Sequence, residues 1–232
     1  MNTVSLAPLA IVILFFAAAI TFALSHRVRL QRIISLVAMV AVLVLESTLL
    51  MSVWDGAPRV VQLADWPAPF GITMVVDQLS ALLLLVSSVI SLAVLIFASG
   101  QEVADNDYEV PISVFYPTYL LLLAGVSNAF LAGDLFNLYV GFEILLMASY
   151  VLITMNANTP RIRSGTTYIV VSVVSSILFL TAIGFIYASV GTVNMADLSL
   201  KLQTLPTGTQ LQLHLMLLIA FGIKAAVFPL SL

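Results

Sequence analysis

Three charged side chains lie inside long apolar stretches of the sequence, and these are Glu46, Glu143 and Lys224. An ionisable group in a bilayer costs at least about 2.5–3.5 kcal/mol on insertion scales, so such a group is a functional candidate by default. In a medium of low dielectric constant, a nearby opposite charge changes how tightly a carboxylate or an amine holds its proton. The residue types therefore point to proton binding and release.

Glu143 has the strongest case of the three. It is the ninth residue of the apolar segment 135–155, and no other charged residue lies within one turn of it. Any charged partner must therefore come from another helix. The structural alternative is a neutral glutamic acid that hydrogen-bonds across helices for packing. We favour a proton-binding group whose occupancy is switched by a neighbouring charge.

Lys224 is the only Lys or Arg well inside an apolar segment, and a proline follows it closely. Pro229 cannot donate a hydrogen bond to the carbonyl of Ala225, and its ring crowds that turn, so the helix should kink or break one residue beyond the lysine. Interrupted helices at membrane depth occur where backbone is buried in protein or lines a wet cavity. A lysine there can accept and donate protons; the alternative is a side chain that snorkels to the cytoplasmic face.

Glu46 and Asp134 are secondary candidates for an ion path. Glu46 is expected nearer the outer face, where the adjacent Ser47 and Thr48 help to solvate it, and a structural position is weighed equally with a functional one. Asp134 occupies a tight turn between two segments, near enough to water to be ordinary. Serine rows on two segments favour close helix packing, with a water chain as the alternative. The rows are Ser87, Ser88 and Ser91, and Ser172, Ser175 and Ser176.

The composition excludes a soluble domain. Of the 232 residues, 62% are hydrophobic and 8% are charged, whereas soluble domains carry about 25% charged residues. There is no cysteine, and the two histidines are far apart, so we expect no disulfide, no metal site and no cofactor. The eight Lys and Arg residues form no basic cluster larger than three, which excludes nucleic acid as a partner.

Seven apolar segments are long enough to span a bilayer as helices, at about 20 residues per span. They cover residues 4–24, 33–53, 76–98, 112–132, 135–155, 166–190 and 210–230. The sequence therefore predicts an all-α integral membrane protein with about seven transmembrane helices. The longest connection contains Trp54, Trp66 and three prolines, and its residues 63–71 are expected to form an ordered cap outside the membrane.

Basic residues are distributed unevenly between the connections. Odd-numbered connections contain five, and even-numbered connections contain two. The five are Arg27, Arg29, Arg32, Arg161 and Arg163, and the two are Arg59 and Lys201. The positive-inside rule places the Arg-rich connections in the cytoplasm and the N-terminus outside. We expect a multi-pass protein of the plasma or inner membrane in this orientation.

Three tracts resemble the antiporter-like membrane proteins. This family includes the proton-pumping subunits of respiratory NADH dehydrogenase and the large subunits of multisubunit cation/proton antiporters. Residues 133–152, with the sequence FEILLMASY inside them, resemble the fifth-helix signature, most closely that of the D subunits of Mrp/Mnh-type Na⁺/H⁺ antiporters. Residues 65–72 with 77–80, and residues 222–230, resemble the same family, and the similarity runs through the whole chain.

The resemblance implies roles for two residues. Glu143 and Lys224 match the glutamate of the fifth helix and the lysine of the broken seventh helix, which form the core of a proton-transfer half-channel in that family. The implied function is monovalent cation (Na⁺)/proton antiport rather than enzyme catalysis. The implied partners are protons, monovalent cations, the lipid bilayer and the other membrane subunits of a hetero-oligomeric complex.

The resemblance also implies that the chain is part of a larger fold, because family members contain two inverted five-helix units. Residues 1–111 would form an N-terminal three-helix region, and residues 112–232 would begin the first five-helix unit, truncated in its fourth helix. Two alternatives stay open. One is a proton-pumping membrane subunit of an NADH:quinone oxidoreductase complex, and the other is a truncated, inactive assembly subunit.

Overall fold

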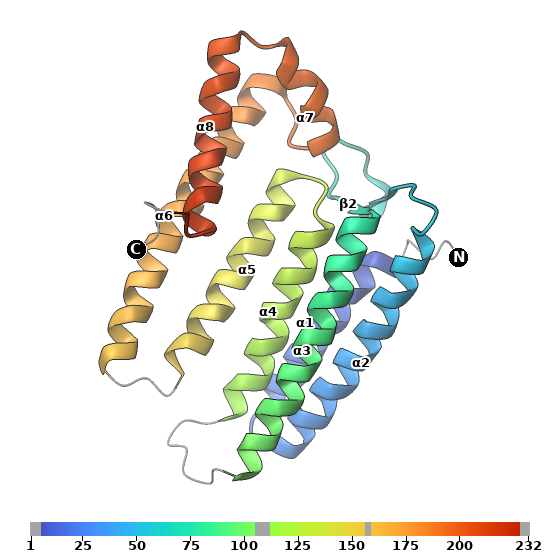
Figure 1. The fold of residues 1–232 in the computed structure, drawn as a ribbon, viewed down its shortest axis with the longest axis vertical. Coiled ribbons are helices and arrows are strands. Elements are labelled where there is room, and N and C mark those ends of the chain that lie inside the picture. The colour runs from blue at the N-terminus through green and yellow to red at the C-terminus, as the bar shows by residue number, and fades with distance from the viewer. Residues whose placement is uncertain (1–5, 105–111, 156–158, 228–232) are drawn as a thin grey trace.

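The computed structural model describes residues 6–104, 112–155 and 159–227, and within these ranges the chain forms eight α-helices and one two-stranded sheet (Figure 1). The helices are α1 (Ala7–Ala23), α2 (Val28–Ser52), α3 (Gln78–Ala104), α4 (Phe115–Leu131), α5 (Leu135–Thr154), α6 (Thr159–Val190), α7 (Met195–Lys201) and α8 (Thr207–Lys224). The strands are β1 (Arg59–Gln62) and β2 (Thr73–Val76). The all-α architecture expected from the apolar segments is confirmed.

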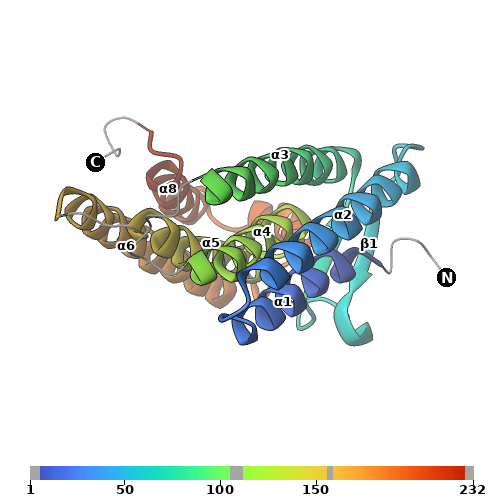
Figure 2. The same cartoon turned by 90° about the horizontal axis from the view of Figure 1, so that it is seen from below.

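The long helices form two packed groups joined through α5. Helices α1 to α4 pack against one another, α5 packs on α4 and on α6, and α8 packs on α6. Figure 2 shows the same order from below, with α5 between the two groups. Each group has its own buried apolar cluster: Leu14, Met39 and Leu120 belong to the first, and Phe179 and Ile186 to the second.

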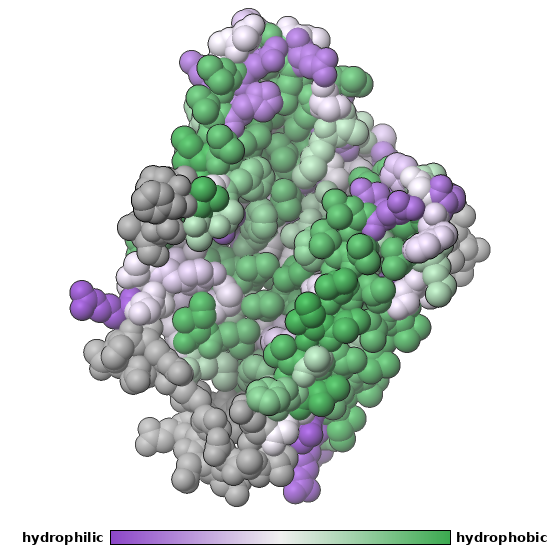
Figure 3. Space-filling model, in the orientation of Figure 1, coloured by the Kyte–Doolittle hydropathy of each residue, from purple (hydrophilic) through white to green (hydrophobic). Residues whose placement is uncertain are grey.

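By length and composition, four of the described helices are able to cross a membrane: α2, α3, α5 and α6. Helices α1 and α4 are shorter apolar helices of 17 residues each. The expected seventh span corresponds to α8, which has 18 residues and falls in neither of these two classes. Figure 3 shows apolar surface along the middle of the molecule, with hydrophilic residues gathered toward its ends. The chain is a multi-pass membrane protein.

Several helices extend beyond the apolar segments. Because α2 begins at Val28, Arg29 and Arg32 lie in its first turns rather than in a connection. Helix α6 begins at Thr159 and has 32 residues, so Arg163 is also helical. Arginine is a good helix former, and a helix therefore continues past the bilayer boundary until a capping signal ends it. Hydropathy alone marks the membrane portion of such a helix and misses its polar extension.

Two connections contain structure that the hydropathy pattern did not predict. The connection after α2 is ordered, as expected, but it includes the antiparallel pair β1–β2, with Arg59 opposite Val76. The connection after α6 contains α7, whose N-terminus is capped by the side chain of Asn194, which accepts hydrogen bonds from two backbone amides. An Asn cap is a local signal for a helix start, and it was available in the sequence.

Candidate functional site

Helix α5 carries Glu143 and lies unusually close to α4. A Cβ atom added to Gly125 would lie 2.9 Å from the backbone nitrogen of Leu145, and one added to Gly141 would lie 3.0 Å from Nδ2 of Asn128. Small residues at a helix interface allow this close approach. The two glycines therefore determine which face of α5 meets α4, and with it the direction in which the rest of α5, including Glu143, faces.

Helix α8 ends at the lysine. Lys224 is its last residue, Ala225 follows as the C-cap, and Ala226 has a positive φ of 50°. The amide of Val227 then donates to the carbonyl of Gly222 at 3.0 Å. Helix α8 thus ends beside Lys224, and Pro229, from which a helix break was predicted, lies outside the described residues. A cation in the last turn also interacts favourably with the helix dipole.

The amino group of Lys224 has two neutral neighbours. Its Nζ atom donates to Oγ of Ser176 on α6 at 3.1 Å, and it lies 5.0 Å from the centre of the Phe142 ring on α5. The first is an ordinary hydrogen bond, and the second has the geometry of a cation–π contact. Ser176 belongs to a serine row that the sequence suggested was used for packing; one of its members proves to be the lysine's hydrogen-bond partner.

Glu143 and Lys224 are electrostatic neighbours but are not bonded to each other. The two charges interact across the α5–α8 interface. Within the ranges that the structure describes, the salt bridges are Arg59–Asp55 and Lys201–Asp197, and neither intramembrane residue forms one. The Oε1 atom of Glu143 is buried and makes no hydrogen bond to the described residues. The carboxylate thus has an open acceptor site near a lysine that is held by a neutral hydroxyl.

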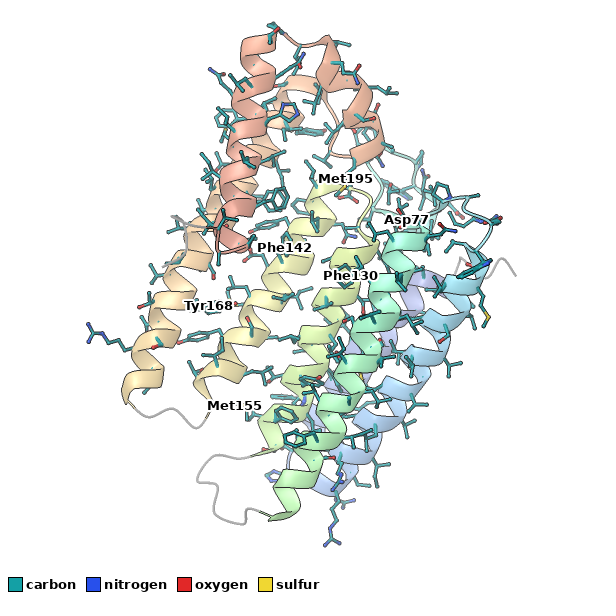
Figure 4. The ribbon with its side chains drawn as sticks, viewed as in Figure 1. Asp77, Phe130, Phe142, Met155, Tyr168 and Met195 are labelled. Carbon is teal, nitrogen blue, oxygen red and sulfur yellow. The ribbon has the colours of Figure 1, made fainter. Side chains whose placement is uncertain are left out.

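A cavity of about 500 Å³ lies between α5, α6 and α8, beside the amine. Lys224 and Phe142 line it together with the polar side chains of Ser164, Thr167 and Tyr168. Figure 4 shows Phe142 and Tyr168 directed into the space between α5, α6 and α8. A cavity with several polar groups and this volume is large enough for water. The lysine therefore borders a space in which water can exchange protons with its amine.

An aromatic cluster lies next to the amine through the ring of Phe142. The rings of Phe142, Phe179 and Phe221 contact one another, with 4.9 Å between the centres of Phe179 and Phe221. Phe179 is fully buried, and it also meets Tyr139 edge to face. Phe142 thus belongs both to the cluster and to the lining of the cavity, and the Lys224 amine borders apolar rings as well as a space with polar side chains.

Asp134 is not the water-exposed turn residue that the sequence suggested. It is 4% exposed, and its carboxylate accepts from the amide of Asn137 at 2.7 Å and from the amide of Thr73 at 3.1 Å. The residue therefore caps α5 and joins it to β2. Asn194 strengthens this junction by donating to the hydroxyl of Thr73. The expectation of a solvated position was wrong because the β-hairpin covers the turn.

Glu46 is also placed differently from expectation. It is completely buried among α2, α3 and α4, and its partners are Ser88 and Ser127. The adjacent Ser47 and Thr48 instead donate to carbonyls of their own helix. Glu46 therefore belongs to the first helix group and is not brought together with the residues on α5 and α8.

Outside the membrane-spanning helices, the pKa of one carboxyl group, that of Asp197, is shifted by a neighbouring side chain. A hydrogen bond from Lys201 lowers the pKa of the Asp197 carboxyl, helped by a hydrogen bond from Thr192. The pair is one helical turn apart on α7 and is partly exposed. Exposed pairs of this kind contribute little to stability, so we assign it no part in the site.

The family model and the most similar curated proteins point to the same family. Residues 132–232 match the family model described as NADH:quinone oxidoreductase/Mrp antiporter, TM. The chain is 37% identical over 231 residues to the D subunit of the Na(+)/H(+) antiporter of Alkalihalophilus pseudofirmus and 38% identical over 231 residues to that of Bacillus subtilis. Each match covers 99% of this chain and 46% of the relative, so the chain spans about half the length of these curated relatives. The D subunit of a probable K(+)/H(+) antiporter of Rhizobium meliloti is 41% identical over 175 residues, which is 74% of this chain and 31% of that protein.

Solved structures agree with the fold. The chain superimposes on the Mrp complex from Dietzia sp. DQ12-45-1b with a TM-score of 0.87 and 28% identity, covering all of this chain and 42% of the other. The membrane-bound sulfane sulfur reductase, an archaeal respiratory complex, superimposes with a TM-score of 0.86 and 27% identity, covering 98% of this chain and 46% of the other. Respiratory complex I from Thermus thermophilus superimposes with a TM-score of 0.79 at 21% identity, covering 97% of this chain and 45% of the other. This likeness concerns the fold alone.

Proposed function

Because the chain belongs to the NADH:quinone oxidoreductase/Mrp antiporter family and is a homologue of the D subunit of Mrp Na⁺/H⁺ antiporters, we propose that it serves a complex that exchanges protons for monovalent cations. Its part is to carry protons through the membrane by way of Glu143 and Lys224. One observation carries this assignment. A buried oxygen of Glu143 has no partner among the described residues, and the ring of the adjacent Phe142 lies 5.0 Å from the Lys224 amine, which a neutral serine holds.

The geometry suggests how the two residues act on protons. When the Lys224 amine lies close to Glu143, each charge stabilises the other, and the lysine keeps its proton. When the amine moves to Ser176, as in this structure, that stabilisation weakens and the proton can pass to water in the adjacent cavity. A lysine has a flexible four-carbon stem, which suits it to moving between two partners.

Assembly and orientation are part of the same proposal. The Dietzia relative is a chain of a multisubunit Mrp complex, and we expect the present chain to assemble with further membrane subunits. The distribution of basic residues favours an N-terminus outside the cell. In that orientation the cavity beside Lys224 lies toward the cytoplasmic half of the membrane, because α8 runs from its outer end at Thr207 to the lysine.

The alternative is a proton-pumping subunit of an NADH:quinone oxidoreductase complex. It would use the same two residues, and the family model covers both classes. The antiporter is favoured because the identity to antiporter D subunits is 37–38% along 99% of the chain, whereas the identity to complex I is 21%. A third candidate is an assembly subunit without an ion path, and a transport measurement distinguishes all three.

Antiport can be measured with the chain in its membrane assembly, in inverted vesicles that hold a pH gradient. We expect Na⁺ or K⁺ to dissipate the gradient in the unaltered protein, and both cations are needed because the matching D subunits differ in the cation that their names give. Glu143→Gln and Lys224→Ala should each slow dissipation by roughly 100-fold, the usual contribution of a positioned proton donor or acceptor.

Two exposed charges provide matched controls. Asp55→Asn and Lys201→Ala remove a carboxylate and an amine that form surface pairs outside the proposed path, and both should leave antiport unchanged. Undiminished antiport in both site variants would refute the proposed proton path. Proton movement that depends on NADH oxidation, and not on an added cation, would support the oxidoreductase alternative instead.

A further inference from the structure

A second ionisable group is buried in the membrane portion of the molecule, away from Glu143 and Lys224. Glu46 on α2 is 0% exposed, and its carboxyl group reaches toward α3 and α4. Ser88 on α3 donates to one carboxyl oxygen, and Oγ of Ser127 on α4 lies 3.5 Å from the other. Burying a carboxyl group at such a position is costly and needs a reason. The partners indicate what that reason is.

Both partners of Glu46 are hydroxyl groups, which can donate or accept. When Glu46 is ionised, the two hydroxyls of Ser88 and Ser127 donate to its two oxygens. When Glu46 is protonated, its O–H group donates to one serine, and the other serine donates to its carbonyl oxygen. Rotation of a hydroxyl is enough to change between these patterns. The site therefore satisfies both protonation states without moving a helix.

The neighbouring helices bring no charge to this site. Helix α1 contains no titratable side chain, and α4 contributes only two tyrosines. Of these, Tyr119 donates its hydroxyl to the carbonyl of Ser91 at 2.9 Å, and Tyr116 is 1% exposed. No described lysine or arginine forms a salt bridge with Glu46. A fixed cation would have held the carboxylate permanently ionised, and none is present among the described residues.

The charged residues of α2 and α3 lie near the ends of these helices. At 1.5 Å per residue, Arg32 is about 20 Å along α2 from Glu46. Asp77, which precedes α3, lies about 16 Å along the helix axis from Ser88. At such distances their fields are weak compared with the local effect of the two serines. The proton affinity of Glu46 is therefore decided by its burial and its hydroxyl partners.

Further buried polar groups follow Ser127 along α4 and the α4–α5 turn. Ser127 is followed on α4 by Asn128, which donates to the backbone and side-chain oxygens of Asn137. The backbone amide of Asn137 in turn donates to the carboxylate of Asp134. These residues are 4–6% exposed, and Nδ2 of Asn137 makes no hydrogen bond to the described residues. Buried polar groups of this kind are commonly satisfied by ordered water.

We propose that Glu46 is a second proton-binding site, which takes up and releases a proton between α2, α3 and α4. On release, the carboxyl O–H bond breaks, the proton passes to a water molecule, and the carboxylate that is left accepts hydrogen bonds from Ser88 and Ser127. The site is separate from the Glu143–Lys224 pair, and it does not depend on the proposed antiport function.

Infrared difference spectroscopy on the chain in its membrane assembly tests this proposal, because a protonated carboxylic acid has its own C=O stretching band. We expect a band that is present at low pH, fades reversibly as pH rises, disappears in Glu46→Gln and persists in Glu143→Gln. A band that never titrates would show a permanently neutral glutamic acid and would overturn the proposal. The absence, at every pH, of a carboxylic-acid band that Glu46→Gln removes would show a permanent carboxylate, with the same consequence.

A milder substitution keeps the test available if Glu46→Gln does not fold. Ser88→Ala leaves the carboxyl group in place but removes its closest partner, so the band should move to higher frequency. Ser47→Ala is the matched control, because Ser47 is adjacent to Glu46 and donates only to the carbonyl of Leu43. A shift in the control but not in Ser88→Ala would also contradict the proposal. Loss of antiport in Glu143→Gln with an unchanged Glu46 band would separate the two sites.

Discussion

The three intramembrane charges share a feature at the scale of the residue: none of them is held by a fixed opposite charge among the described residues. Lys224 donates to Ser176, and Glu46 interacts with Ser88 and Ser127. Glu143 has a free acceptor atom among the described residues. A hydroxyl tolerates a change of protonation in its partner, because it can reverse its own hydrogen bond. This property separates groups that exchange protons from groups that only carry a charge.

Asp134 is the counter-example, because its partners are two backbone amides, which can only donate. These bonds give the side chain a structural role, so we predict an effect on stability rather than a specific role in transport. Asp134→Ala should destabilise the protein by about 2 kcal/mol or more, since it removes a helix cap and leaves a buried amide unsatisfied. Thermal unfolding of the purified protein measures this as a lower midpoint.

Asp134→Asn is the informative comparison, because asparagine retains one acceptor oxygen and is itself a good N-cap. We expect a smaller loss of stability than in the alanine variant, and near-normal antiport in the protein that remains folded. If antiport were abolished in the asparagine variant at full stability, Asp134 would belong to the ion path after all.

At the scale of the element, the function of α5 depends on how closely it meets α4. Gly125 and Gly141 each face backbone atoms of the opposing helix at about the contact limit. Side chains larger than hydrogen at these positions would separate the helices and rotate Glu143 relative to Lys224. The end of α8 matters equally, because it places the Lys224 amine beside Ser176 and the ring of Phe142.

Gly125→Ala is therefore predicted to destabilise the protein by about 1–3 kcal/mol, the usual cost of overpacking. Its Cβ atom would lie 2.9 Å from one backbone atom and 3.0 Å from another, and backbone cannot move aside cheaply. Gly184→Ala on α6 is the matched control, because nothing lies within 4 Å of its Cβ position. That control should be neutral or stabilising by up to about 1 kcal/mol. Equal effects of the two substitutions on the unfolding midpoint would contradict the close-approach argument.

At the scale of the whole molecule, the two helix groups each contain one proton-binding candidate site. Glu46 lies in the group formed by α1 to α4, and Lys224 lies in the group that includes α6 and α8, with α5 between them. The junction of β2, the α4–α5 turn and the start of α7 ties the groups together at one end, through contacts of Gly133 with Thr73 and Met195. Figure 4 shows Met195 and Asp77 at that end.

The predicted orientation of the molecule can be tested directly, because the chain contains no cysteine. Ser199 on α7 and His26 before α2 are both exposed, and they lie on opposite sides of the membrane in the proposed topology. A membrane-impermeant thiol reagent should label Ser199→Cys in intact cells, but should label His26→Cys only after permeabilisation. The cysteine-free parent protein provides the background. The reverse pattern would invert the topology and move the cavity beside Lys224 to the outer half.

The sequence by itself determined the class of the molecule and the approximate position of its membrane helices, and it predicted the two leading residues and a helix break beside Lys224. These are local signals: a charge in an apolar segment or a proline after a lysine is visible without knowing any neighbour. Helix ends and the short connections were less accessible, because α6 continues through polar residues and the hairpin depends on pairing between distant segments.

Only the tertiary structure decided which groups surround each charge. Ser176 is separated from Lys224 by 48 residues, and Ser127 from Glu46 by 81. Burial of Glu46 and Asp134 likewise depends on helices and strands that the sequence places far away. The physical reason is that helix periodicity gives the face of a residue but not the rotation of the helix that faces it. That rotation is fixed by packing, and it determines whether a buried charge meets a hydroxyl, an amide or another charge.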